Sequence, residues 1–447
     1  MTTFDRQDPR RLLMYGPGYL DRLPEIRRLP DERIFEMKVV ASVLPFKANN
    51  YVVEDLIDWD AVPDDPIFQL TFPQRGMLSD EHFATMARLH RTGAPPAEIK
   101  EAANRIRLEL NPHPAGQLSH NVPTLDGEPL PGLQHKYRET VLLFPSAGQT
   151  CHAYCTFCFR WPQFVGMEDM KFAAREMEPV VRYLRRRPHV TDVLITGGDP
   201  MVMKAAVLAR YIEPLLEIDS IRDIRIGSKA LGYWPHRFVT DEDAGDVLGL
   251  FDRVVQSGRH LAFMAHFSHA RELDTPVVAE AIRRIRATGA VVRSQSPVLR
   301  HINDSTDAWI TMWRRQVQLG VIPYYMFVER NTGAKRYFEL PLAEALEIFV
   351  GAYRSVSGLA RTVRGPSMST LPGKVRIDGV TEIRGERAFM LTFLQARDPD
   401  WVRRPFFARF DPDATWLTDL RPAFGEERFF YEDGLDEMLR ARDSSAA

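Results

Sequence analysis

The segment Cys151-His-Ala-Tyr-Cys155-Thr-Phe-Cys158 contains every cysteine of the 447-residue chain, with the spacing C-x3-C-x2-C. Three thiolates on one short loop can ligate three irons of a cubane 4Fe-4S cluster and leave the fourth iron open for another ligand. An open iron indicates a functional cluster and not a structural one. Structural clusters and zinc sites usually employ four protein ligands, and the chain has no fourth cysteine. Two alternatives stay open: zinc held by the three cysteines with a histidine such as His152, and three buried cysteines that are neighbours by coincidence.

The composition of the whole chain excludes several classes of protein. Its 58 Lys and Arg balance 60 Asp and Glu, and the net charge of -2 provides no basic field for nucleic acid. An odd count of three cysteines argues against a disulfide framework. No apolar run is long enough to span a bilayer, and residues 1–13 lack the apolar stretch of a secretory signal. We therefore expect a cytoplasmic globular protein with neither a membrane nor a nucleic-acid partner.

The sequence on both sides of the cysteines favours an α/β fold. From about residue 138, short apolar runs alternate with longer amphipathic stretches, which is typical of βα units and a parallel sheet. The expected strands are Val141–Phe144, Asp192–Thr196, Asp223–Ile226, Leu261–Ala265, Val291–Ser294 and Ile322–Val328. The expected helices are Ser79–Arg91, Pro96–Leu110, Lys171–Arg186, Val207–Glu217, Asp241–Gln256, Pro276–Thr288 and Ser305–Gly320. We predict a six-stranded partial (β/α)6 barrel over residues 136–335, with an N-terminal wrapping and helical segment over 1–135 and a C-terminal extension over 336–447.

The carboxyl ends of the strands are where such a barrel places its chemistry. The expected strand that ends at Thr196 continues into Gly197-Gly198-Asp199-Pro200. The two glycines let backbone carbonyls approach a ligand closely, and Asp199 adds an acceptor for an ammonium group. His266 and Gln295 stand at the ends of two later strands. We expect these residues to share one face of the barrel with the cysteine loop.

This combination of motifs resembles the radical S-adenosylmethionine (radical SAM) superfamily. The cysteine spacing and the aromatic Phe157 before the third cysteine match its cluster motif, and the Gly-Gly-Asp-Pro turn resembles the one that contacts the methionine amino group of SAM. Roughly residues 55–380 further resemble lysine 2,3-aminomutase and its relatives in the order of their motifs. The matching segments are PGLQHKYRETVLLF, CHAYCTFCFR, DVLITGGDP, RIGSK, HFSHA, SQSPVLRHINDS and IPYYMF.

The resemblance implies an isomerase that uses SAM together with pyridoxal 5'-phosphate (PLP). Enzymes of that family shift an amino group between adjacent carbons of an amino acid through a 5'-deoxyadenosyl radical. It implies conversion of a free, basic α-amino acid into its β-isomer, a reductant such as flavodoxin or ferredoxin as partner, and a homo-oligomer as one possible assembly. Two further interpretations are kept. One is a PLP-independent radical SAM enzyme that abstracts hydrogen from an unknown peptide or metabolite, and the other is a non-catalytic metal-binding interaction protein.

The resemblance also assigns catalytic residues. Lys374, in Leu371-Pro372-Gly373-Lys374, matches the lysine that binds PLP covalently, a role that needs a lowered pKa. Arg160 matches the arginine that pairs with the substrate carboxylate, for which a guanidinium is geometrically suited. Asp304 matches one of two aspartates that bind the terminal ammonium of lysine, while the second falls near the uncharged Ser367. One carboxylate would still attract a cationic side chain.

Cofactor-binding positions follow in the same way, with two departures from the family pattern. Lys136 and Tyr137 occupy the PLP-phosphate region, and His266 and Gln295 resemble positions that line the cofactors. The glycine run that precedes the family lysine is replaced by residues 367–371, SMSTL, and the C-terminal zinc-binding cysteines are absent. Any oligomer would therefore form without that zinc.

Overall fold

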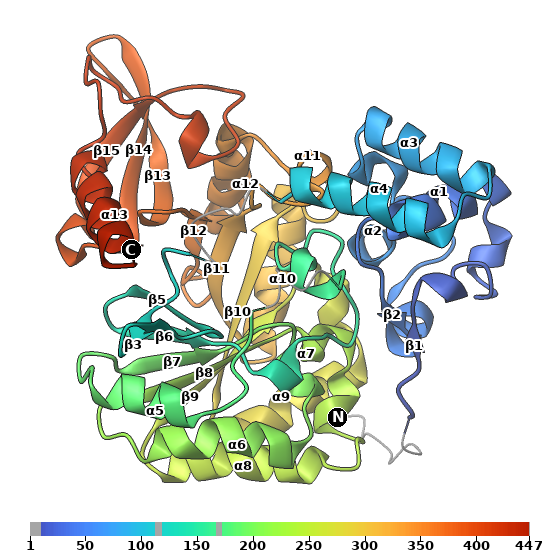
Figure 1. Cartoon of the computed structure of the whole chain (residues 1–447), viewed down its shortest axis with the longest axis horizontal. Coiled ribbons are helices and arrows are strands. Elements are labelled where there is room, and N and C mark those ends of the chain that lie inside the picture. Colours follow the sequence, from blue (N-terminus) through green and yellow to red (C-terminus); the bar gives the residue numbers. More distant parts are fainter. Residues whose placement is uncertain (1–9, 112–118, 167–171, 447) are drawn as a thin grey trace.

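One mixed sheet of eleven strands forms the centre of the molecule (Figure 1). The computed structural model describes residues 10–111, 119–166 and 172–446. Along the sheet the strands follow the order β15-β14-β13-β12-β11-β10-β9-β8-β7-β6-β5. Their bounds are β5 (Leu133–Tyr137), β6 (Thr140–Leu143), β7 (Asp192–Ile195), β8 (Asp223–Ser228), β9 (His260–His266), β10 (Val291–Val298), β11 (Ile322–Val328), β12 (Arg364–Ser369), β13 (Gly373–Ile383), β14 (Glu386–Ala396) and β15 (Pro405–Arg409).

The six strands expected from the sequence are confirmed as β6 to β11, and each pairs in parallel with the next. The sheet does not end with these six strands, because it continues through a seventh parallel strand, β12, into the antiparallel strands β13, β14 and β15. β12 reads Arg-Gly-Pro-Ser-Met-Ser and lacks the apolar run that marks the other strands. Its neighbours bury it nonetheless, so only the tertiary structure identifies it.

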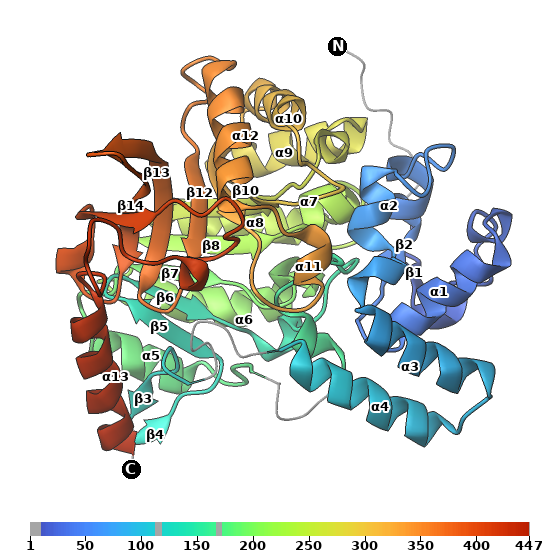
Figure 2. The ribbon, with the colours of Figure 1, turned by 90° about the horizontal axis from the view of Figure 1, so that it is seen from above.

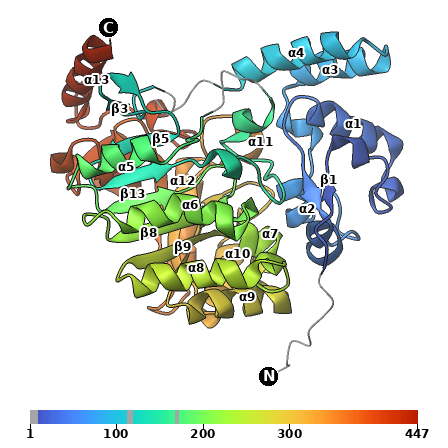
Figure 3. The same ribbon diagram turned by 60° about the horizontal axis from the view of Figure 1, so that its bottom comes forward.

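Helices cover one side of this sheet (Figure 3). The bounds are α1 (Asp31–Ala41), α2 (Pro66–Thr71), α3 (Asp80–Arg91), α4 (Pro96–Glu109), α5 (Glu178–Arg185), α6 (Ala205–Leu216), α7 (Ala230–Tyr233), α8 (Ala244–Gln256), α9 (Pro276–Ala287), α10 (Thr306–Gln318), α11 (Lys335–Phe338), α12 (Leu342–Arg354) and α13 (Glu432–Ala446). α9 illustrates why they form: the Thr275 hydroxyl accepts from the Val278 N–H at its start, Pro276 occupies the first turn, and Ile282 and Ile285 are buried. No helix among the described residues is long and apolar enough to cross a bilayer.

The expected helices are found, with one correction. α5 begins only at Glu178, whereas the sequence suggested a start at Lys171, which lies outside the described residues. Ala174 is held instead beside the end of β6, where its N–H donates to the carbonyl of Phe144 at 2.7 Å and its carbonyl accepts from Ser146 at 2.9 Å. These bonds keep that segment extended.

The N-terminal and C-terminal parts of the chain pack on opposite sides of the central strands (Figures 1 and 2). Residues 10–111 contribute α1 to α4 and the short strands β1 (Met14–Tyr15) and β2 (Ala48–Asn49) on one side. On the other side α13 packs with β13 to β15 around a second core that includes Phe393, Phe406 and Tyr431. Several aromatic residues of the tail are therefore core residues.

One edge of the sheet, at β5, comes back against the ends of β12 and β14. The Lys136 amine on β5 donates to the carbonyl of Thr370, which follows β12. The Arg397 guanidinium just after β14 donates to the side chain of Asn121 at 2.5 Å. The short hairpin of β3 (Thr124–Leu125) and β4 (Glu128–Pro129) lies between Asn121 and β5. The sheet therefore curves around the space into which its central strands point.

Candidate active site

A cavity of about 330 Å³ lies at the carboxyl ends of the parallel strands. Its wall combines the cysteine loop, the strand ends and the lysine-bearing strand β13. Residues that line it include Lys136, Tyr137, Cys151, Cys155, Cys158, Arg160, Gly197, Gly198, Asp199, Arg225, Lys229, His266, Gln295, Tyr325, Phe327, Glu329, Arg330 and Lys374. Of the site residues that the sequence predicted, only Asp304 is outside this wall.

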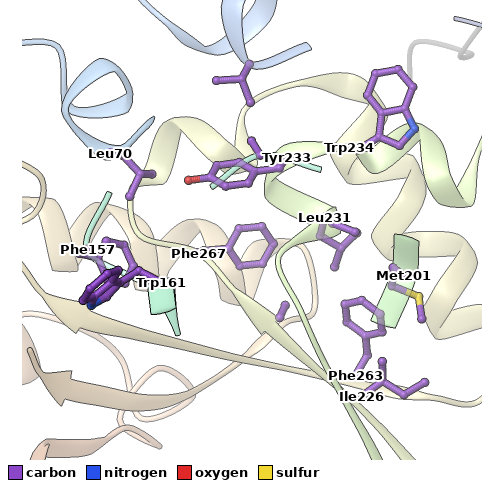
Figure 4. Packing of buried hydrophobic residues seen from close by; sticks show 14 of the residues in the cluster. Leu70, Phe157, Trp161, Met201, Ile226, Leu231, Tyr233, Trp234, Phe263 and Phe267 are labelled. Atoms are coloured by element: carbon purple, nitrogen blue, oxygen red, sulfur yellow. The ribbon is translucent and has the colours of Figure 1, made fainter. Parts of the chain in front are cut away.

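The cysteine loop is held from below by the N-terminal segment. The Asn49 side chain donates to the carbonyl of His152 and to that of Tyr233, at 3.0 Å each. The Thr156 N–H donates to the carbonyl of Leu70 at 3.0 Å. Beside these bonds, Phe157 of the loop belongs to one packed cluster of buried hydrophobic residues together with Leu70, Trp161 and Tyr233 (Figure 4). The sequence predicted no site residue in the N-terminal segment. Its residues Asn49 and Leu70 nevertheless help to position the loop.

The three cysteine thiols are free and face the same cavity. Burial raises the pKa of Cys155 to about 11 and that of Cys158 to about 12, and the negative charge of a Cys155 thiolate adds to the effect on Cys158. A metal that bound these sulfurs would offset that cost, because metal ligation favours the thiolate. The donor set of three thiols and no fourth cysteine fits a 4Fe-4S cluster with one open iron.

A compact zinc site is not formed by these residues. The His152 side chain is buried but does not line the cavity. Among the residues that the structure describes, no three His, Cys, Asp or Glu side chains are grouped as ligands of one ion. A single zinc would gather its sulfur ligands at about 2.3 Å from one centre, whereas a cubane presents a separate iron to each.

The Gly-Gly-Asp-Pro turn packs directly against the cysteine loop. Gly197 has φ +146°, a conformation that side chains disfavour. A Cβ at Gly198 would collide with the backbone of Thr150, immediately before Cys151. The Asp199 N–H donates to the carbonyls of Gly148 and Thr150, at 3.1 and 2.7 Å. The turn therefore requires glycine at both positions, and its backbone lines the cavity, where it fits the amino end of SAM.

Asp199 uses its carboxylate to shape the turn. One oxygen accepts from the Met201 N–H at 2.9 Å and the other from the Lys229 N–H at 2.8 Å. Burial raises the pKa of this carboxyl to about 6, against the lowering effect of these bonds. The residue lines the cavity as the sequence predicted, but both oxygens already accept hydrogen bonds.

The amine of Lys374 lies beside two aromatic rings, an environment that suits a nucleophilic amine. Lys374 is the second residue of β13, and its amine lies 4.1 Å from the ring centre of Tyr325 and 5.5 Å from that of Phe327. Burial, with the nearby Arg225 charge, lowers its pKa to about 7. A large share of this amine is therefore neutral near pH 7, which fits covalent binding of an aldehyde such as PLP.

Arg160 presents an unsatisfied guanidinium to the cavity. Its Cζ lies 4.3 Å from the ring centre of Phe144, and its Nη1 is buried without a hydrogen-bond partner among the described residues. Burial lowers its pKa to about 9, although the Cys158 sulfur acts in the opposite direction. An unpaired buried guanidinium is costly, so the site fits a carboxylate here.

Lys136 and Tyr137 are half-buried on β5 and line the cavity. Desolvation lowers the pKa of the Lys136 amine well below its usual range, and the charges of Arg397, Arg330 and Lys374 add to that effect. Burial raises the pKa of the Tyr137 phenol. This concentration of positive charge fits a phosphate group.

The remaining predicted residues divide into two groups. His266 and Gln295 line the cavity at the ends of β9 and within β10, and burial lowers the pKa of His266 well below its usual range. Asp304 is exposed, and one of its oxygens accepts from the backbone N–H of His301 at 2.9 Å. It shapes the turn before α10 and lies outside the cavity wall, so the structure does not bring it to the site.

Several cavity residues were missed by sequence reasoning, among them Lys229 and Arg330. Lys229 directly follows β8, and Arg330 is the second residue after β11. The rule that chemistry gathers at strand ends would have marked both, but neither carries a recognisable motif. Lys229 pairs with Glu272 at 2.6 Å, with the two side chains 8% and 0% exposed.

Comparison with known proteins finds relatives that carry the same family name. The "Putative L-lysine 2,3-aminomutase" of Aquifex aeolicus is 30% identical over 408 residues, 91% of this chain and 96% of that protein. The L-lysine 2,3-aminomutase of Clostridium subterminale is 28% identical over 264 residues, 59% of this chain and 60% of that enzyme. No family model matches the chain. The structure of SuiB from Streptococcus suis covers 64% of this chain at 13% identity, with a TM-score of 0.36.

The match to the Aquifex protein extends over nearly the whole of both chains and includes the cysteine loop and the segment around Lys374. By this similarity, the chain belongs to the lysine 2,3-aminomutase family of the radical SAM superfamily.

Proposed function

We propose that the protein is a PLP-dependent radical SAM aminomutase that converts an α-amino acid into its β-isomer. The supporting observation is the shared cavity, where the three thiols, the unpaired guanidinium of Arg160 and the low-pKa amine of Lys374 meet. Each of these groups suits a different component of the reaction.

When bound, SAM on the cluster supplies a radical that removes hydrogen from the substrate, and PLP supplies conjugation that stabilises the carbon radical. The cysteines Cys151, Cys155 and Cys158 would hold the cluster, and the turn at 197–199 would receive the amino end of SAM. Lys136 and Tyr137 would bind the PLP phosphate, with His266 and Gln295 along the cofactor wall.

The residues of the chain position the substrate. Arg160 binds its carboxylate and fixes the α-carbon beside the cysteine loop. Lys374 provides a neutral amine in the same cavity and takes up or gives off a proton as this amine binds or releases PLP. The apolar walls formed by Tyr325 and Phe327 exclude water from the reactive groups.

The reaction needs a one-electron reductant of low potential. A flavodoxin or ferredoxin in the cytoplasm suits this role, and we propose that compartment and that class of partner. The expectation of a basic substrate rested on Asp304, which is outside the cavity, so the substrate class must be argued from other residues.

The test is anaerobic reconstitution with iron, sulfide and PLP, followed by dithionite and SAM. We expect formation of 5'-deoxyadenosine, β-isomers from at least one common amino acid, and a borohydride-reducible PLP adduct located on Lys374 by mass spectrometry. Lys374→Ala should abolish the adduct, whereas Lys204→Ala, at an exposed position, should not. Deoxyadenosine without any PLP adduct would favour the PLP-independent enzyme instead.

A further inference from the structure

The cavity wall carries more positive than negative side chains. Its cations are Lys136, Arg160, Arg225, Lys229, Arg330 and Lys374, and its acids are Asp199 and Glu329. Two of the cations already have carboxylate partners outside the wall. Arg225 binds Asp192 through two nitrogens, one of them at 2.8 Å, and Lys229 pairs with the buried Glu272. Four cations remain for ligands.

Arg330 is the one of these four without a role in the proposed function. Its Nη2 donates to the carbonyl of Ser369 at 3.1 Å, and its Cζ lies 4.5 Å from the ring centre of Phe159. The Arg160 Cζ lies 5.0 Å from the same ring. The two guanidinium groups therefore share a single aromatic neighbour and lie in one region of the cavity.

Both arginines have a buried Nη1 with no hydrogen-bond partner among the described residues. A guanidinium nitrogen that has lost water and gained no acceptor carries a substantial desolvation cost. The bond to Ser369 and the contact with Phe159 fix the orientation of Arg330, so this nitrogen does not turn away to solvent. Two separate oriented donors in one cavity match two carboxylates.

We propose that the substrate is a dicarboxylic α-amino acid, with its α-carboxylate on Arg160 and its side-chain carboxylate on Arg330. The inference rests on the proposed function and replaces the basic substrate that the resemblance implied. It adds Arg330 as the residue that determines side-chain specificity.

The acids of the wall do not offer a site for a cationic side chain. Both oxygens of Asp199 accept backbone hydrogen bonds. Glu329 is 4% exposed, and burial raises the pKa of its carboxyl well above the usual range, so it tends to remain uncharged. With Asp304 outside the cavity, a lysine or arginine side chain would bring a second cation beside Arg330 without a charged partner.

The reaction on such a substrate is balanced within one molecule. The C2–N bond breaks and a C3–N bond forms, while one hydrogen moves from C3 to C2, so the product has the same formula and no oxidant is consumed. Aspartate would return aspartate by this shift. Glutamate is therefore the shortest unbranched substrate with a distinguishable product, the achiral 3-aminopentanedioate.

The experiment compares amino acids with the reconstituted holoenzyme. Glutamate, 2-aminoadipate, lysine, arginine and alanine are each supplied with dithionite and SAM, and β-isomers are measured by mass spectrometry. We expect the kcat/KM for glutamate or 2-aminoadipate to exceed that for lysine by at least about 100-fold, because lysine places like charges together. Preference for lysine or arginine would overturn the inference.

The variant Arg330→Gln provides the second arm. Loss of a charge-assisted bond should weaken binding of the dicarboxylic amino acid by about 10- to 100-fold, measured by calorimetry on the holoprotein without turnover. Arg330→Lys should recover part of the affinity, and Arg336→Gln, at an exposed position nearby in sequence, should leave it unchanged. PLP content should be equal in all variants.

The outcomes separate the competing explanations. If Arg330→Gln loses PLP while its affinity for glutamate is unchanged, Arg330 holds the cofactor phosphate and the inference is wrong. If no amino acid yields an isomer although SAM is cleaved, the proposed aminomutase function fails. In that case calorimetry still decides whether the cavity binds a dicarboxylic amino acid through Arg330.

Discussion

The phenol oxygen of Tyr233 lies 3.3 Å from the sulfur of Cys155. Tyr233 is buried on α7, a short helix that follows β8. When the sulfur is a thiolate on iron, only the phenol can donate this hydrogen bond. A residue remote in sequence from the cysteine loop therefore contacts one of its ligands.

Removing that hydrogen bond should lower the reduction potential of the cluster. Hydrogen bonds to cluster sulfurs stabilise the reduced, more negative state. We expect Tyr233→Phe to assemble the cluster but to shift its potential by tens of millivolts to more negative values, measured by redox titration with electron paramagnetic resonance. Tyr211→Phe, which removes a phenol bonded to Ser146, is the control. An unchanged potential in Tyr233→Phe would show that the bond is absent in the holoprotein.

Gly198→Ala should prevent correct assembly of the site. The new methyl group would meet backbone atoms of Thr150, which cannot turn away as the end of a flexible side chain could. We expect reduced iron content and a lower melting temperature. Gly245→Ala is the matched control, because a Cβ there meets open space on α8 and should stabilise the helix by about 0.5–1 kcal/mol. Normal iron loading of Gly198→Ala would contradict the close packing described above.

The reaction of Lys374 with PLP should depend on pH near neutrality. A protonated amine has no lone pair, and the pKa of Lys374 is lowered to about 7. At pH 6 about a tenth of the amine is neutral, and at pH 8 about nine tenths, so the initial rate of adduct formation should rise through this range. Borohydride trapping at several pH values measures it. A midpoint near 10, the ordinary value for lysine, would contradict this burial effect.

Breaking the Lys229–Glu272 pair should destabilise the fold. The Glu272 side chain is 0% exposed, so Lys229→Met leaves a buried carboxylate without its cation. Loss of one partner of such a pair costs about 3–5 kcal/mol, which urea unfolding can measure. The double variant Lys229→Met, Glu272→Gln should recover much of the loss because no charge then remains. Equal stability of the single and double variants would count against an ionised Glu272.

The core of the fold was predictable because its signals are local. Each strand from β6 to β11 contains a short apolar run. The helices α3, α4, α6, α8, α9 and α10 show helical spacing of apolar residues or a clear cap. β12 was not predicted because Gly365, Pro366 and its serines are residues typical of loops. Pairing with neighbouring strands buries this segment and makes it a strand. The antiparallel strands β13 to β15 lie outside the alternation of strands and helices, so that pattern could not predict them.

The candidate site shows the same division. The cysteine spacing, the Gly197-Gly198 turn and Lys374 are recognisable because their chemistry requires particular residue types in a fixed local order. Asp304 was mistaken for a cavity residue because its local motif says nothing about the direction of its side chain, which a backbone N–H holds at the surface. Arg330 and Lys229 were missed because a single cation after a strand has no distinguishing pattern.

The sequence by itself determined the class of chemistry: three thiolates, a glycine turn and a lysine specify which groups the site can hold. Only the tertiary structure decided which charged side chains face the cavity, which are neutralised by buried partners, and where the sheet ends. Local motifs are sufficient for ligation and turn geometry, which involve a few consecutive residues. The charge balance of a cavity depends on side chains brought together from β5 to β13, and no single stretch of the chain contains that information.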